Sequence, residues 1–395
     1  MIRFWMLNAA VFAAASVGAA DDRLADARRL AHEALIADTH IDVPYRLHER
    51  WEDVTGPTAH GEFDYPRAIA GGLDLAFMSI YTPASMEKSG GGRELAHRLI
   101  DSVEALAARA PDRFALVRST ADVERLHRHG RVLLALGMEN GSPIEGDLAN
   151  LRAFHARGVR YVTLAHGESN HLSDSSYDPN RRWGGLSPFG ENVVAEMNRL
   201  GMMVDVSHLS DDAVSDVLRV STAPVIASHS SARKFTPGFE RNLDDALIEA
   251  IAAKGGVVQI NFGSAFLTEA ANRWSTAHAT AHDAWRAAEG ADASDAEDTE
   301  WEARYRAQNP YPYADVAAVA DHIDHAVKLA GIAHVGIGSD FDGVGDSLPL
   351  GLKSVADYPL LIAELLRRKY SEADIRKILG ENLMRVWRAV EDAAQ

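Results

Sequence analysis

Short apolar stretches alternate with longer amphipathic stretches along most of the chain. Eight of the apolar stretches are predicted to be strands, and most of them end in a polar residue. They are residues 35–40, 73–81, 132–139, 161–166, 202–208, 224–229, 256–262 and 335–340. The segments between them have the apolar spacing of surface helices. The clearest of these are residues 94–108, 192–200, 211–220 and 243–253.

Strand–helix alternation of this kind predicts a parallel sheet. Eight repeats within this length favour a closed (β/α)8 barrel of the TIM type, an α/β fold. The alternative is an open, doubly wound sheet. No Gly-x-Gly-x-x-Gly follows any of the predicted strands, so a dinucleotide-binding fold has no support.

One segment, about residues 268–315, breaks the alternation, because it is rich in Ala, Glu, Asp and Arg and contains no clear strand. It is predicted to be a helical excursion after strand seven, and whether it covers the barrel mouth stays open. Residues 359–387 predict two closing helices, with Ser371 as an N-cap. Because there is no linker or internal repeat, residues 21–395 are predicted to form a single barrel domain.

The first twenty residues resemble a secretion signal. Arg3 precedes an apolar run that ends in small residues, and Asp21 follows at once. We therefore expect export to the periplasm or the medium; the alternative is an uncleaved membrane anchor. The polar residues 390–395 argue against a C-terminal lipid-anchor signal.

Composition excludes several classes of protein. The 395 residues carry a formal net charge of −17, and a nucleic-acid-binding protein would need a basic surface instead. The chain contains no cysteine, which excludes a disulfide scaffold, a thiol nucleophile and a cysteine-ligated zinc site.

Candidate chemistry lies at the ends of the predicted strands. Active sites of (β/α)8 barrels are built where the strands end, and residues two apart on a strand face the same side. Six of the strands end in His, Asp or Glu, whereas random placement would scatter such residues along strands and helices. The residues concerned are His40, Asp42, Glu139, His166, His208, His229 and Asp340.

These residue types predict a metal centre. Imidazoles and carboxylates without sulfur suit zinc, and also manganese, iron or cobalt. A carboxylate such as Glu139 can bridge two cations about 3.5–4 Å apart. The alternative for Glu139 is a buried ion-pair partner, but its own apolar strand supplies no cation.

Weaker candidates carry two interpretations each. Arg241 is either a clamp for a substrate carboxylate or a surface arginine. Tyr45 and Tyr81 either line the pocket or belong to the core. His171 and Asp174 are candidates for supporting the site residues without contacting the metals or the substrate themselves.

Seven motifs occur together in one order along the chain. In these motifs the sequence resembles the renal (membrane) dipeptidase family of zinc peptidases, and the resemblance extends over about residues 35–387. The motifs are residues 38–42 (DTHID), 137–141 (GMENG), 186–190 (LSPFG), 204–208 (VDVSH), 224–230 (PVIASHS), 336–343 (GIGSDFDG) and 377–382 (KILGEN).

The resemblance implies two zinc ions per chain. His40 and Asp42 would hold one ion, His208 and His229 the other, and Glu139 would bridge both.

The resemblance also implies catalytic and substrate-binding roles. Asp340 would take the proton of the bridging water and pass it to the leaving amine, and His166 would polarise the scissile carbonyl. Arg241 would hold the terminal carboxylate of the dipeptide, with Tyr45 and Tyr81 lining the pocket.

The implied activity is hydrolysis of dipeptides, L-L and also L-D, through a hydroxide that bridges the metals. A homodimer and small dipeptide substrates are implied too. Asn140, where many relatives have glycine, and Tyr45, where the mammalian enzymes have tryptophan, put substrate preference in doubt. Two alternatives stay open. One is an amide or lactam hydrolase of a periplasmic secondary-metabolite pathway. The other is a non-catalytic binding or maturation protein, which would be expected to lack a ligand or Asp340.

Overall fold

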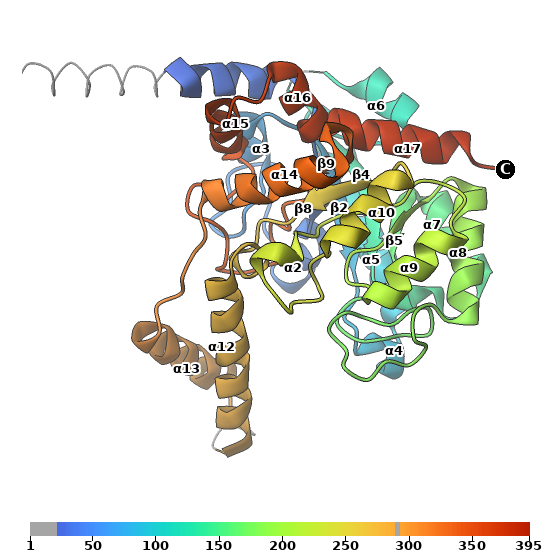
Figure 1. The fold of residues 1–395 in the computed structure, drawn as a ribbon, viewed down its shortest axis with the longest axis vertical. Coiled ribbons are helices and arrows are strands. Elements are labelled where there is room, and N and C mark those ends of the chain that lie inside the picture. Colours follow the sequence, from blue (N-terminus) through green and yellow to red (C-terminus); the bar gives the residue numbers. More distant parts are fainter. Residues whose placement is uncertain (1–21, 129, 289–292) are drawn as a thin grey trace, which may run out of the picture.

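The computed structural model describes residues 22–128, 130–288 and 293–395 (Figure 1). In these ranges the backbone forms one parallel sheet with the strand order β1-β2-β4-β5-β6-β7-β8-β9, and β3 pairs with β4 off this path. The strands are β1 (Ile36–Ile41), β2 (Leu73–Tyr81), β3 (Phe114–Leu116), β4 (Val132–Glu139), β5 (Val159–Thr163), β6 (Met203–Asp205), β7 (Ile226–Ala227), β8 (Val257–Ile260) and β9 (Val335–Ile337).

The two ends of the sheet meet just beyond β1 and β9. The amide of Asp340 donates to the carbonyl oxygen of His40 (3.1 Å), and the amide of Asp42 donates to that of Phe341 (2.9 Å). These bonds nearly close the sheet into a barrel. The predicted (β/α)8 fold is therefore confirmed, and the open doubly wound sheet is wrong.

Several strands end earlier than predicted at their C-terminal ends, where the candidate site residues lie. Strands β2 and β4 have the predicted bounds, but β6, β7 and β9 end before the polar residues that were placed on them. His208 and Asp340 instead adopt left-handed backbone conformations, with φ of 68° and 64°. Such a conformation is uncommon outside glycine and ends a strand, so these side chains project from turns at the barrel mouth.

Strand β3 was not predicted. It pairs with residues 132–134 of β4, while residues 136–139 of β4 pair with β5. Two strands thus share one edge of β4, and each uses half of its length. The three residues of β3 are too few to give a periodic signal in the sequence.

The barrel interior is filled by side chains of alternate strand positions. Leu133 and Ala135 of β4 pack there with Leu75 and Phe77 of β2. Since strand side chains alternate with period two, Glu139 lies on the same inward face at the top of β4. The lower end is closed by Trp387, whose ring lies 5.2 Å from that of Phe77.

Helices lie outside the barrel sheet, and two of them, α12 and α13, form an arm that projects from it. Residues 22–33 are helical, and the helices that follow are α2 (Val43–Glu49), α3 (Tyr65–Gly71), α4 (Met86–Ser89), α5 (Gly92–Arg109), α6 (Thr120–Leu126), α7 (Leu148–Arg157), α8 (Pro188–Leu200), α9 (Asp211–Val220), α10 (Asp245–Ala253), α11 (Ser264–Leu267), α12 (Glu269–Ala288), α13 (Asp295–Gln308), α14 (Val316–Ala330), α15 (Tyr358–Arg367), α16 (Glu372–Arg376) and α17 (Asn382–Asp392). Ser371 caps α16 by accepting from the amide of Asp374, as predicted, and a π-helical turn (Lys377–Glu381) joins α16 to α17. In the part of the chain that the structure describes, no helix is both long and apolar enough to cross a bilayer.

The excursion after β8 forms a two-helix arm, α12 and α13. Figure 1 places the arm at the end of the barrel away from α17, where it projects from the body of the molecule. Its two helices are held together by the stacked rings of Trp285 and Trp301, 5.7 Å apart, and by a hydrogen bond between Nε2 of His282 and Asp298 Oδ1 (3.0 Å). The predicted helical excursion is confirmed. The predicted signal peptide lies outside the described residues.

Candidate metal centre and substrate pocket

The seven candidates at the predicted strand ends come together at the barrel mouth. Three groups of their ligand atoms each lie within 4.8 Å of one another, and Glu139 and His40 each belong to two of the groups. The groups are His40, Glu139 and His229; Glu139, His166 and His208; and His40, Asp42 and Asp340. Residues from six strand ends therefore form one continuous cluster.

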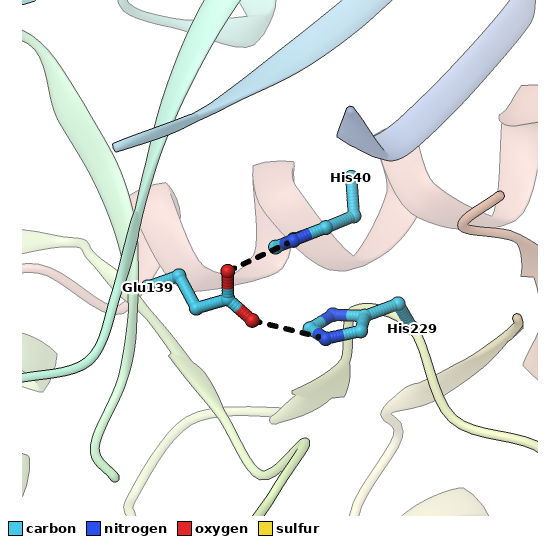
Figure 2. A group of neighbouring side chains, drawn as sticks. All are labelled: His40, Glu139 and His229. Atoms are coloured by element: carbon cyan, nitrogen blue, oxygen red, sulfur yellow. Dashed lines mark ion pairs between the residues drawn. The ribbon is translucent and has the colours of Figure 1, made fainter. Parts of the chain in front are cut away.

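Glu139 lies at the centre of the cluster, and its two oxygens face different neighbours. Oε2 lies 3.3 Å from Nε2 of His40. Oε1 lies 3.1 Å from Nε2 of His208 and 3.3 Å from Nε2 of His229. Figure 2 shows the carboxylate between the rings of His40 and His229, with one oxygen directed to each. One carboxylate thus faces two separate sets of imidazole donors.

The ring of His40 is oriented from below by Tyr161. The Tyr161 hydroxyl donates to the carbonyl oxygen of Thr39 (3.0 Å) and lies 2.8 Å from Nδ1 of His40. Because a hydroxyl has one proton, it accepts from Nδ1, so Nε2 is the nitrogen of His40 that faces the carboxylates. Gly137 makes room for this tyrosine, since a Cβ at Gly137 would lie 1.9 Å from the phenol carbon.

The ring of His229 is oriented by a serine and an aspartate. Ser228 Oγ donates to Asp205 Oδ2 (2.6 Å) and lies 2.7 Å from Nδ1 of His229. Nδ1 therefore donates to the serine, and Nε2 keeps its lone pair toward Glu139. Such partners commonly fix the tautomer of a metal-binding histidine. Burial lowers the pKa of both His208 and His229 well below the usual value, so that both are neutral and free to coordinate.

Asp340 and Asp42 lie together on the other side of His40. Asp42 Oδ2 is 3.4 Å from Nε2 of His40, and Asn261 Nδ2 donates to Asp340 Oδ2 (2.7 Å). A Cβ on Gly343 would approach both carboxylates to 2.3 Å, so this position requires glycine. Burial raises the pKa of Asp340 to about 7; the charges of Asp42 and Glu139 raise it too, and that of His40 lowers it.

The donor set fits a divalent metal. Nε2 of His40 is buried without a hydrogen-bond partner among the described residues, although three carboxylates surround it. Nε2 of His208 and Nε2 of His229 lie 2.9 Å apart beside the same carboxylate oxygen. Among the described residues these buried carboxylates have no lysine or arginine partner, and imidazole nitrogens face them. Such a set can hold a cation, because buried charge is stable only when it is compensated.

A cavity of about 850 Å³ opens above the cluster. Asp42, Glu139, His166, His208 and Asp340 form its floor. Tyr45 and Tyr81 line its side, with their rings 4.9 Å apart, and the Tyr81 ring lies 4.9 Å from that of His166. The structure thus places both tyrosines at the pocket rather than in the core.

Arg241 is buried beside the cluster, with only 2% of its surface exposed. Its guanidinium donates to the carbonyl oxygen of His229 (2.8 Å) and to Ser230 Oγ (2.8 Å), and it lies 5.2 Å from the centre of the Phe266 ring. Among the described residues no carboxylate lies within 4.0 Å of it, whereas the charge of Arg241 lowers the pKa of His208, after burial itself. It is therefore a buried, unpaired cation at the edge of the site and not a surface arginine.

The comparison with known families agrees with this geometry. A family model described as membrane dipeptidase (peptidase family M19) matches residues 24–395. The chain belongs to this family. It is a metallo-dipeptidase, and the resemblance predicted from its motifs is confirmed.

Individual relatives are similar over most of the chain. The dipeptidase aclJ of Aspergillus oryzae is 35% identical over 343 residues, which cover 85% of this chain and 72% of that protein. The probable dipeptidase PvdM from Pseudomonas aeruginosa has a TM-score of 0.82 at 28% identity, covering 95% of this chain and 100% of that one. A metallo peptidase from Rhodobacter sphaeroides, liganded with a phosphinate mimic of L-Ala-D-Ala, has a TM-score of 0.74 at 26% identity, covering 90% and 99%.

Three residues of the dipeptidase site are absent from the candidates found in the sequence. Tyr161 and Asn261 lie on or next to strands and position His40 and Asp340. Both lie in predicted strands, and Tyr161 stands among apolar residues like a core aromatic, so no sequence pattern singled out either residue. Tyr177 lines the cavity from the loop between β5 and α8, with its ring 5.9 Å from that of His208, and no sequence pattern marks it.

The two supporting candidates have other roles in the dipeptidase. His171 pairs with Glu87 (3.0 Å) away from the cluster. Asp174 is buried and accepts from the amides of residues 182–185, so it shapes the loop that carries Tyr177. Neither residue contacts a metal-ligand candidate in the part of the chain that the structure describes.

Proposed function

We propose that this metallo-dipeptidase is binuclear and cleaves the peptide bond of L-L and L-D dipeptides, with zinc as its metal. The observation that carries the proposal is the position of Glu139, whose two oxygens face two different ligand sets. His40 and Asp42 would hold one ion, and His208 and His229 the other, with Glu139 shared. The absence of sulfur and the imidazole-rich set are compatible with zinc.

The metals would supply Lewis acidity and a nucleophilic water at neutral pH. The remaining steps belong to the protein. His166 lies on the cavity floor, and burial lowers its pKa, which leaves a neutral ring able to donate a hydrogen bond to the scissile carbonyl oxygen. Asp340 Oδ1 is not held by Asn261 and would accept the proton of the attacking water and deliver it to the leaving amine.

Arg241 supports specificity for dipeptides. A buried guanidinium without a carboxylate partner is well placed to bind a carboxylate of the substrate. The same guanidinium donates to the carbonyl oxygen of His229 (2.8 Å), so a carboxylate that it bound would lie beside the cluster. The relative bound to a mimic of L-Ala-D-Ala supports acceptance of a D-residue at this position.

Metal removal provides the test of this function. The purified protein is expected to contain close to two zinc ions per chain and to cleave L-Ala-L-Ala and L-Ala-D-Ala. Dialysis against a chelator should abolish both activities, and added zinc should restore them. Metal content would be measured by mass spectrometry and cleavage by chromatography of the released amino acids.

Two other outcomes would contradict the proposal in different ways. Two metals without dipeptide cleavage would favour the lactam or amide hydrolase, and a carbapenem is the first substrate to try in that case. One metal per chain at full activity would refute the binuclear centre and leave the dipeptidase reaction standing.

We also propose that residues 1–20 direct export and are then removed, and that the mature enzyme is a homodimer. The support for export is the sequence pattern alone, and for the dimer the family resemblance. N-terminal sequencing of protein recovered from the periplasm and the medium should begin near Asp21, and light scattering should give twice the chain mass. An intact N-terminus in the membrane fraction would contradict removal of residues 1–20 and favour the uncleaved membrane anchor.

A further inference from the structure

One wall of the cavity above the metal centre is apolar, and none of the proposed catalytic steps uses it. Its residues are Tyr177 of the β5–α8 loop, Ala265 and Phe266 of α11, and Val344 of the loop after β9. The same cavity has His208 and Asp340 on its floor. A substrate bound over the cluster would therefore lie beside this apolar wall.

Aromatic contacts hold the apolar wall together. The ring of Phe239 packs edge-to-face with Tyr177, at 5.9 Å, and with Phe266, at 5.7 Å. A Cβ at Gly263 would lie 2.8 Å from the Phe266 ring and 3.1 Å from Val344, so these two side chains are neighbours, and glycine makes room for them. The wall is thus one surface assembled from separate segments of the chain.

Tyr177 presents an open apolar surface on a fixed backbone. Although it lines the cavity, 43% of its surface is exposed. The amide of the preceding residue, Ser176, donates to the carbonyl oxygen of His208 (2.8 Å), and the Tyr177 amide donates to Ser175 Oγ (3.2 Å). An exposed aromatic ring held in place beside other apolar residues is typical of a binding surface.

Arg241 relates the apolar wall to one end of the substrate. Its guanidinium lies 5.2 Å from the centre of the Phe266 ring. Desolvation raises the pKa of Tyr177 to about 12, and the charge of Arg241 acts against this rise, so the two side chains are within electrostatic reach. A carboxylate bound to Arg241 would lie next to the wall. The terminal carboxylate and the side chain of the same residue share one α-carbon, so that side chain would reach the wall too.

We propose that the apolar wall is the specificity subsite for the C-terminal residue of the dipeptide and selects a large apolar side chain there, above all an aromatic one. This inference rests on the proposed dipeptidase function. Tyr177 and Phe266 would bury apolar surface against such a side chain, and contact between aromatic rings adds to the gain. A charged side chain would lose hydration against the wall and find no partner in it.

The test compares three dipeptides in the zinc-loaded mature enzyme: L-Ala-L-Ala, L-Ala-L-Phe and L-Phe-L-Ala. The last two have the same composition and differ only in the residue that carries the ring. For L-Ala-L-Phe, kcat/KM is expected to exceed that of L-Ala-L-Ala by on the order of tenfold, about the effect of one aromatic contact with the area that it buries. The greater part of the difference should lie in KM.

Two variants of one residue test the wall directly. Tyr177→Ser removes the ring and should abolish the preference for L-Ala-L-Phe over L-Ala-L-Ala, whereas Tyr177→Phe keeps the ring and should retain it. The ratio of kcat/KM for L-Phe-L-Ala to that for L-Ala-L-Ala should not change in either variant. A merely structural effect would lower the activity on all three substrates together and leave both ratios as they are.

Trp51→Ser is the matched control. It also removes an exposed aromatic side chain, since Trp51 is 68% exposed, but Trp51 does not line this cavity. Both ratios should keep their wild-type values in this variant.

The outcomes separate the two levels of the argument. If the zinc-loaded wild type cleaves none of the three dipeptides, the proposed function fails. If it cleaves them without preferring L-Ala-L-Phe to L-Ala-L-Ala, or if Tyr177→Ser keeps that preference, the subsite is refuted while the dipeptidase stands. A loss in Tyr177→Ser that affects L-Phe-L-Ala instead would refute the assignment of the wall to the C-terminal residue.

Discussion

Replacement of Asp340 by asparagine is expected to lower kcat for dipeptides by about 10²- to 10⁴-fold, the range that a lost general acid–base group produces. Asparagine has the shape of aspartate and can still accept from Asn261 Nδ2, which now donates to Asp340 Oδ2 at 2.7 Å. The fold should therefore be kept. An amide cannot take the proton of the attacking water, so turnover should be lost.

The metal content of the Asp340→Asn variant tests whether Asp340 is a general base or a direct metal ligand. It lies in one group with His40 and Asp42, so the geometry alone also permits a direct ligand. We expect Asp340→Asn to keep two zinc ions and Asp42→Asn, the matched control, to lose one of them. Metal analysis, circular dichroism and kcat would be measured on both variants. Normal turnover in Asp340→Asn, or loss of zinc from it, would remove Asp340 from its proposed role.

Replacement of Arg241 by alanine should raise KM for L-Ala-D-Ala by about 30-fold to several thousand-fold, the effect of truncating one partner of a buried charge pair. The corresponding neutral ester of the dipeptide has no carboxylate to lose, so its KM should change little. The reason is that Arg241 has no acidic partner among the described residues and is available to the substrate. KM would be determined for both compounds with the wild type and the variant.

Arg233 is the matched control for this experiment. It is also partly buried, but its guanidinium is already paired with Asp211, so Arg233→Ala should not change the preference for a free carboxylate. Because Arg241→Ala leaves a void, Arg241→Lys is the second variant; it keeps the charge, and we expect an intermediate KM. Equal increases in KM for dipeptide and ester would rule out the carboxylate clamp.

The barrel could be predicted because its signal is local and repeated. Strands β2 and β4 were predicted with their observed bounds, since each is a long apolar run between polar residues. Strands β6, β7 and β9 were predicted too long, since the apolar run of the sequence continues after the hydrogen bonding of the sheet has ended. The short β3 was missed, because its pairing with β4 is visible only in three dimensions.

The residues that position the metal-ligand candidates were harder to predict from the sequence. Tyr161 lies among apolar strand residues and resembles a core aromatic, and only its distance of 2.8 Å from His40 reveals its role. Gly137 precedes Glu139 in a motif, but the reason for a glycine there is the tyrosine ring of the next strand. Asp174 was a candidate for supporting the site, and it organises a loop instead. The sequence contains no information on which backbone amides its carboxylate accepts from.

The sequence by itself determined the types of ligand at the strand ends, the absence of sulfur, the alternation of strands with helices and the family. These are properties of residue identity, order and period, and a parallel barrel necessarily brings its strand ends to one face. Only the tertiary structure decided that the two oxygens of Glu139 face different ligand sets and that Arg241 is buried with no acidic partner in the part of the chain that is described. It alone decided that Tyr311 of the arm lines the same cavity as Asp340. Such relations join residues far apart in the chain, and packing and closure of the barrel fix them.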